Sequence, residues 1–159
     1  MEALIDKLIG EIQSASEATQ AEGGFADLLP IASIYFGDPG VIPASLYPCI
    51  TVEPDWSGPL AGTTGYDTRE LRVIMSVHID AREWFDSNSD EAMGDRILVQ
   101  VVEILHRWFQ TRANRTLDGT VRNVEVTEIE FLARDRQTVI AKTARMTLVV
   151  TKNYSRVLD

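Results

Sequence analysis

The side chains best suited to chemistry in this chain are two histidines and one cysteine. His78 stands between Ser76 and Asp80 on the polar side of an alternating segment. A histidine that binds a metal or transfers protons needs partners in fixed geometry, and His106 and Cys49 are the only other residues of these two types. We therefore expect structural roles: His78 on the surface, His106 packed or capping on a helix, and Cys49 buried as a small apolar side chain.

Acidic groups are the second source of chemistry. Asp80 with Glu83, and Glu125 with Glu128 and Glu130, have the carboxylates to bind a divalent ion or to act as acid and base. Charged side chains on one face of a strand are more often solvated. The sequence also lacks GxSxG, HExxH, GxxxxGK[ST], GxGxxG and CxxC motifs. We predict no catalytic, cofactor-binding or metal-binding residues, and hence a protein that is not an enzyme.

Two segments with helical periodicity would help to position these side chains. The first has an apolar stripe and ends before Gly23-Gly24, and its stripe consists of Leu4, Ile5, Leu8, Ile9 and Ile12. The second runs from Met93 to near Phe109 and is apolar on more than one side. Both helices are therefore expected to pack on a sheet.

Alternation and proline positions predict the strands of that sheet. They lie at Ala32–Phe36, Leu46–Glu53, about 70–82, Val121–Leu132 and Ile140–Thr151. Prolines near the first two favour edge strands or bulges. A change of phase after Val126 indicates a bulge near Thr127-Glu128, and Arg134–Gln137 forms the turn of a hairpin. We predict an α+β fold: a mainly antiparallel sheet, two principal helices on one face and a long C-terminal β-hairpin.

Composition bounds the class of protein. The chain has 159 residues, which suits a single domain over residues 1–159, and 15 Lys or Arg against 24 Asp or Glu give a net charge of −9. This balance argues against a protein that grips DNA phosphates over a wide face. No secretory signal and no apolar run of membrane-spanning length is present, so cytoplasmic residence is expected.

The charge is unevenly distributed along the chain. Residues 1–93 contain 4 Lys or Arg and 16 Asp or Glu, whereas residues 94–159 contain 11 and 8. If the two halves occupy different regions, this asymmetry favours head-to-tail association, which closes into a ring when the rotation permits. If they interleave in the fold, the charges neutralise each other locally. Both interpretations are open at this point.

The order of the elements resembles that of the tail terminator proteins of long-tailed bacteriophages, small neck subunits that cap the tail tube. The resemblance spans nearly the whole chain. It rests on the segments EALIDKLIGEI, YPCITVEP, ELRVIMSVHID, DEAMGDRILVQVVEILHRW, VRNVEVTEIEFL and TARMTLVVTKNYSR. The family has no catalytic residues to transfer, and the resemblance implies none here.

The resemblance implies a homohexameric ring in the neck of the virion, assembled in the host cytoplasm. Its partners would be the tail tube protein, the head–tail connector proteins and, as a further candidate, the sheath. DNA would pass through the channel without specific binding, and no membrane is involved. A channel that passes DNA should repel phosphates. We therefore expect some of the following acidic residues to line it: Glu70, Asp80, Glu125, Glu128 and Glu130.

Two segments are candidates for docking partners. The segment Asp55–Tyr66 carries the aromatic residues Trp56 and Tyr66 among small residues, and rigid aromatics often dominate interface energy. The predicted hairpin turn carries Arg134 and Arg136. The alternative for Trp56 is that it packs on its own domain.

Other functions remain open from the sequence. The chain would also suit another neck or head-closure subunit, a small α+β enzyme with carboxylates on one sheet face, or a ligand-binding domain with a pocket between sheet and helices.

Overall fold

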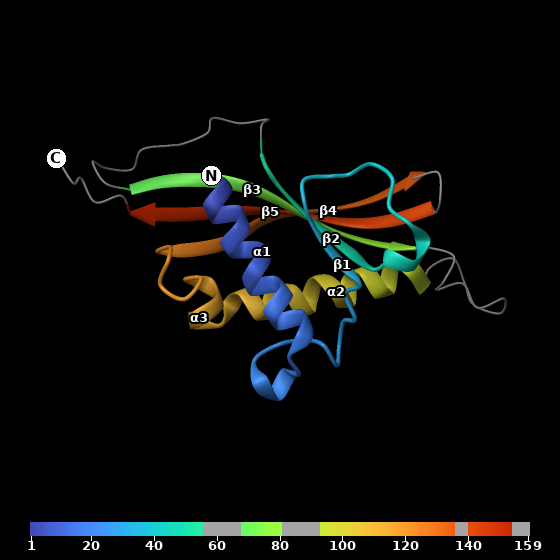
Figure 1. Cartoon of the computed structure of the whole chain (residues 1–159), viewed down its shortest axis with the longest axis horizontal. Helices are drawn as coiled ribbons and strands as arrows, with labels where there is room; N and C mark the ends of the chain where they lie inside the picture. The colour runs from blue at the N-terminus through green and yellow to red at the C-terminus, as the bar shows by residue number, and fades with distance from the viewer. Residues whose placement is uncertain (56–67, 81–92, 136–139, 154–159) are drawn as a thin grey trace.

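The computed structural model describes residues 1–55, 68–80, 93–135 and 140–153 (Figure 1). Its sheet has the strand order β1-β2-β3-β5-β4. Every neighbouring pair is antiparallel except β1 and β2, which are parallel. The strands are β1 Ser33–Phe36, β2 Cys49–Pro54, β3 Thr68–Asp80, β4 Asn123–Asp135 and β5 Ile140–Asn153.

Two principal helices cover one face of this sheet, α1 (Glu2–Glu17) and α2 (Met93–Gln110), and Figure 1 shows them on the same side. The short helix α3 (Arg112–Arg115) follows α2. The predicted α+β class, with helices on one face and a long β4–β5 hairpin, is confirmed. The first helix ends before Gly23-Gly24 as predicted, and a 3₁₀ turn, Gln20–Glu22, separates the two.

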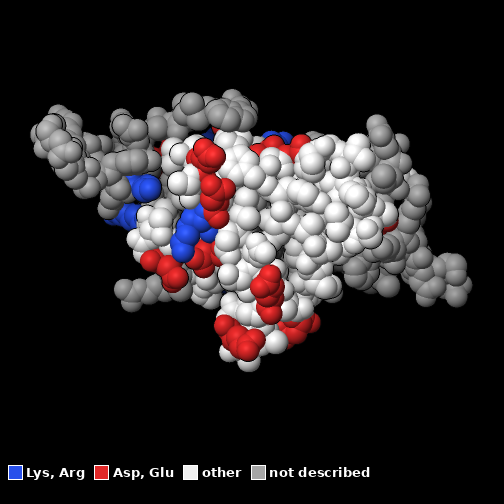
Figure 2. Space-filling view, in the orientation of Figure 1, with Lys and Arg blue, Asp and Glu red and all other residues white. Residues whose placement is uncertain are grey.

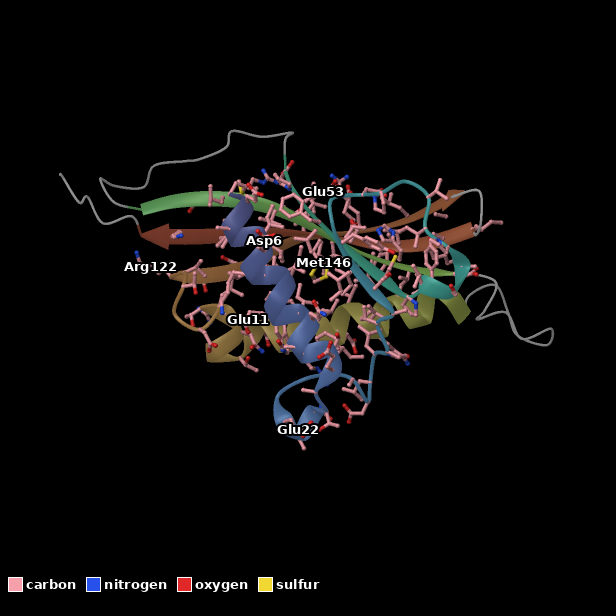
Figure 3. The ribbon with its side chains drawn as sticks, in the orientation of Figure 1. Asp6, Glu11, Glu22, Glu53, Arg122 and Met146 are labelled. Carbon is pink, nitrogen blue, oxygen red and sulfur yellow. The ribbon has the colours of Figure 1, made fainter. Side chains whose placement is uncertain are left out.

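The main core lies between the helices and the inward row of the strands. Met146, labelled in Figure 3, is fully buried there. Trp108 of α2 packs edge-on against Phe25 and Phe109, with ring centroids 6.0 and 4.9 Å away, and so holds α2 to the segment after α1. The period-2 alternation of β3 and β5 supplies the sheet side of this core.

The predicted bulge is present in β4. Its register with β5 shifts between Val126 and Glu128, leaving Thr127 as the extra residue. The shift puts Ile129 opposite Met146, on the helix-covered side, although Val126 and Ile129 differ in alternation phase. The bulge thus keeps Val124, Val126, Ile129 and Phe131 on one side of the sheet.

The second face of the sheet is partly covered by residues 37–48. Ile42 and Tyr47 from this segment pack with Cys49 and Ala141 in a small second core. Cys49 is fully buried, as predicted. One end of the second face is therefore closed off from solvent by a segment that is distant in sequence from β5.

Three details of the predicted strands are wrong. The strand predicted at Leu46–Glu53 begins at Cys49, because residues 44–46 form a 3₁₀ turn. The edge position predicted for the first two strands is confirmed for β1 and wrong for β2, which pairs with both β1 and β3. Alternation along the last strand also predicts a core position for Ile140, which is 47% exposed because it lies at the end of the hairpin.

Candidate functional site

His78 lies at the centre of a buried polar cluster on the second face of the sheet. Its Nε2 lies 3.0 Å from Thr51 Oγ1 on β2, and its Nδ1 lies 2.8 Å from Thr143 Oγ1 on β5. All three residues are 2% exposed. A hydroxyl both donates and accepts, so a neutral imidazole satisfies both threonines in either tautomer. The prediction of a surface histidine is wrong, because residues 37–48 cover this part of the face.

The cluster borders a cavity of about 80 Å³, which holds only a few water molecules. Small-molecule sites usually measure about 300–1,000 Å³. The cavity is lined by Asp38, Thr51, Glu53, Ser76, His78, Leu132, Thr143 and Arg145. Both ring nitrogens of His78 are engaged by threonines, so His78 is not arranged as a base for Ser76. The geometry suits a structural link across three strands.

Side chains that could bind a metal ion are scattered over the described part of the chain. Within residues 1–55, 68–80, 93–135 and 140–153, no group of three or more His, Cys, Asp or Glu side chains is arranged to hold a metal ion. His106 is half-buried on α2, where its Nδ1 lies 3.4 Å from Gln110 Nε2, so it has a packing position as expected.

The five acidic residues predicted to line a channel all lie on the second face of the sheet. Glu70 is half-buried, and Glu125, Glu128 and Glu130 are exposed along β4. Glu130 Oε2 lies 3.6 Å from Arg145 Nη1, a loose ion pair. Asp80 is only 5% exposed, so it does not present its charge to a channel in this subunit. The other four leave an acidic row on one face.

The predicted docking segment begins at a fixed residue. Asp55 is buried, its backbone N–H donates to Arg72 O at 3.1 Å, and its Oδ2 lies 3.1 Å from Arg72 Nε. Trp56, Tyr66 and Arg136 lie outside the described residues. The Asp55–Arg72 ion pair was missed from sequence, because only the β2–β3 register brings the two residues together.

The backbone of Arg134 belongs to β4, where it pairs with Ala141, and its side chain is outside the described part. The turn predicted at Arg134–Gln137 is wrong for its first two residues, since β4 continues to Asp135, and its other two lie outside the described residues.

The two halves of the chain occupy different regions of the sheet. β1, β2 and β3 come from residues 1–93, whereas β5 and β4 come from residues 94–159. The ion pairs Lys7–Glu11, Arg72–Asp55 and Arg145–Glu130 each join residues of the same half. Within the sheet, the two halves of unequal charge are thus separated, with the more acidic half in β1, β2 and β3.

Exposed acidic side chains gather at the C-terminal end of α1 and in the segment that follows this helix. Glu17, Glu22 and Asp27 are exposed there, and Figure 2 shows acidic residues gathered at this end of the molecule, where Figure 3 labels Glu22. Hydrogen bonds from the backbone N–H and the hydroxyl of Thr19 hold the pKa of Glu22 below its ordinary value. Glu22 therefore keeps its charge to lower pH than an ordinary glutamate does.

Exposed large apolar side chains gather at the two outer strands. Beside β1 they are Leu28, Phe36 and Val41, which are 46–52% exposed and which we name the β1-edge patch. Figure 2 shows a broad uncharged area to the right of α1, on the side of β1 and residues 37–48. Beside β4 they are Val99, Ile129, Phe131 and Ile140, which we name the β4-edge patch.

A groove of about 440 Å³ lies within the β4-edge patch. It is lined by Leu98, Val99, Phe131, Leu132, Ala133 and Lys142. A second hollow of about 290 Å³ lies further along α2 and β4, with His106, Phe109 and Arg115 in its wall. β4 is thus incompletely covered by α2.

Comparison with known proteins gives no relative from which a role can be transferred: no protein-family model matches the chain, and no curated protein matches its sequence. In the described part of the chain, no helix combines the length and apolarity needed to cross a membrane. Function must therefore be argued from the surfaces of the protein itself.

Proposed function

We propose that this protein is a structural assembly subunit that forms a ring, in the manner of a phage tail terminator. The ring, a hexamer, caps the tail tube and joins the tail to the head connector in the virion neck. The observation that carries the proposal is the gathering of exposed apolar side chains at both open edges of one sheet. Apolar sheet edges that stay uncovered invite pairing with another chain, and large exposed apolar patches mark interaction sites.

The acidic row on the second face suits a channel for DNA. Glu125, Glu128 and Glu130 are exposed on β4, and Glu70 lies on the same face of β3. Carboxylates repel the phosphates of a duplex, so DNA would slide past this face without being retained. The row therefore favours transient passage over specific binding.

The partners outside the ring are the tube below and the connector above, with the sheath as a further candidate. Trp56 and Tyr66 are the residues we propose for docking, together with Arg134 and Arg136. Buried Asp55 gives the first segment a fixed starting point. Trp56→Ala should weaken binding to tail tubes in co-sedimentation and leave the melting temperature of the subunit unchanged. Unchanged binding would remove this segment from the docking surface.

Light scattering of the purified protein across concentration and salt tests the ring. We expect a mass near six times 17.7 kDa, and negative-stain images should show rings with a central hole. A mass that falls at high salt would support association between the acidic and basic halves. A protein that stays monomeric and does not bind tail tubes would contradict the proposal.

A ligand-binding domain is the second candidate function, and the groove of about 440 Å³ beside α2 and β4 favours it. A thermal-shift screen with metals, nucleotides and apolar ligands distinguishes the two. A clear rise in melting temperature would support the ligand-binding function, because a ligand that binds only the folded state stabilises it.

A further inference from the structure

We infer that the β4 edge of one copy docks against the β1 edge of the next copy, so that subunits add head to tail through their sheets. This inference rests on the proposed function and deepens it, because it names the two surfaces that join neighbouring subunits. It is argued from three properties of the two edge strands: how far other elements cover them, which charged residues they carry, and which apolar side chains they expose.

The β4 edge is long and poorly protected. β4 has 13 residues, and in the described part of the chain its one strand partner is β5. Its bulge and its glutamates protect the second face of the strand, but residues 124–133 place no charged side chain on the helix-covered side. On its helix-covered side Ile129 is 38% and Phe131 is 51% exposed, beside the groove formed with Val99. An exposed apolar edge strand of this length tends to pair with another chain.

The β1 edge offers a matching surface. Ser33–Phe36 pairs with β2 on one side, and its residues SIYF carry no charge. Phe36 is 49% exposed, and exposed Leu28 and Val41 lie in the segments that enter and leave this strand. The stretch from residue 8 to residue 68 contains no Lys or Arg. The β1 edge is therefore apolar at its centre, and the chain that leads into and out of β1 carries acidic groups and no cations of its own.

Charge opposes the pairing of like edges. Two β4 edges placed side by side would bring Glu125, Glu128 and Glu130 of one copy against the same row of the other, and like charges across paired strands are destabilising. Two β1 edges would bring together two regions that lack cations. The unlike pairing avoids the first contact, because the four residues of β1 itself, SIYF, carry no charge.

The helix layer adds an attraction to the unlike pairing. When two sheets join edge to edge with their helices on the same side, the segment that enters β1 faces the neighbour's α2 and α3. The end of α1 and the segment between α1 and β1 carry the exposed acidic residues Glu17, Glu22 and Asp27. The neighbour's α2 and α3 carry the exposed arginines Arg107 and Arg115. Opposite charges across an interface fix its register and speed its formation.

The experiment uses two variants of the full chain, each with one edge blocked. Phe131→Glu places a charge on the β4 edge, and Phe36→Glu places one on the β1 edge. Both positions are about half exposed, so the fold should tolerate either change, and circular dichroism melting checks this. Gln13→Glu on the exposed side of α1 is the control that adds the same charge elsewhere.

We expect each edge variant alone to lose assembly and to scatter as one subunit, whereas Gln13→Glu keeps the wild-type mass. An equimolar mixture of the two edge variants should form a dimer and stop there. The reason is that Phe131→Glu retains a working β1 edge and Phe36→Glu retains a working β4 edge. Such complementation is specific to unlike surfaces.

The other outcomes separate this inference from the proposed function. Rings that survive both substitutions would overturn the edge pairing and leave the ring function standing. Loss of assembly in Phe131→Glu alone would indicate a symmetric β4 contact and overturn the inference. Open fibres that both substitutions abolish would support the edge pairing and contradict the ring. A wild-type protein that is monomeric at every concentration would overturn the inference directly.

Discussion

His78 links β2, β3 and β5 through two threonine hydroxyls, and all three side chains are only 2% exposed. Its importance therefore lies in what its removal leaves behind. A buried hydroxyl without a partner loses its hydration and gains nothing in return. The cluster therefore stabilises the fold only when every one of its polar groups has a hydrogen-bond partner.

His78→Leu should lower the free energy of unfolding by about 1–3 kcal/mol for each of the two threonine hydroxyls left unsatisfied. Urea unfolding followed by circular dichroism measures the change. Adding Thr51→Val and Thr143→Val to the same protein should recover much of the loss, because no buried hydroxyl then lacks a partner. A His78→Leu protein as stable as the wild type would show that the hydrogen bonds contribute little.

Sequence alone could predict the side of the sheet on which these residues lie, and no more. Alternation along β3 places Ser76, His78 and Asp80 on the second face, as the register confirms. Their burial depends on residues 37–48, which cross that face from far along the chain. Local periodicity carries no information about such a cover, so His78 and Asp80 were both expected in solvent.

At the scale of elements, the most informative feature is the bulge in β4. Apolar residues alternate in one phase up to Val126 and in the other phase from Ile129 onward. One extra residue between them is needed to keep both sets on the same face of the sheet, so the bulge could be predicted from the sequence. The pairing of β1 with β2 was not visible, since alternation does not state which strands are neighbours or whether they run parallel. Helix and strand bounds were thus more predictable than topology.

Deletion of Thr127 should leave the fold intact, because the ladder then runs from Val126 to Glu128 without changing the side on which any residue lies. We expect a loss of no more than about 1.5 kcal/mol, the usual upper value for one hydrogen bond, here the bond from Thr127 Oγ1 to Thr147 O. Thermal unfolding measures it.

Deletion of Ile129 is the matched control. Without the bulge it would place Glu128 opposite Met146, on the apolar side, and should lower the melting temperature more than the deletion of Thr127 does. Equal melting temperatures for the two deletions would show that the bulge does not set the facing of β4.

At the scale of the whole molecule, the separation of the two halves across the sheet decides between the two interpretations of the charge pattern. Within the sheet the halves lie side by side, since β3 and β5 meet at a single boundary, and they overlap where residues 37–48 pack over β5. A subunit with one acidic side and one more basic side attracts its own copies head to tail. The same arrangement leaves the second face of β4 with its acidic row, away from the helix layer.

The triple substitution Glu125→Lys, Glu128→Lys and Glu130→Lys tests whether this row faces DNA in the assembled ring. If it does, the variant ring should retain duplex DNA in a filter-binding assay. The retention should weaken with salt, because each lysine–phosphate contact lowers the logarithm of affinity by about 0.9 for each unit in the logarithm of salt concentration.

The control must change the net charge equally on the other side of the sheet. Glu2→Lys, Asp6→Lys and Glu103→Lys does so, because these residues are exposed on α1 and α2. If both triple variants bind DNA equally well, net charge alone explains the effect and the row on β4 does not line the channel. If only the β4 variant retains DNA, the second face of the sheet points inward, and the helices lie on the outside of the ring.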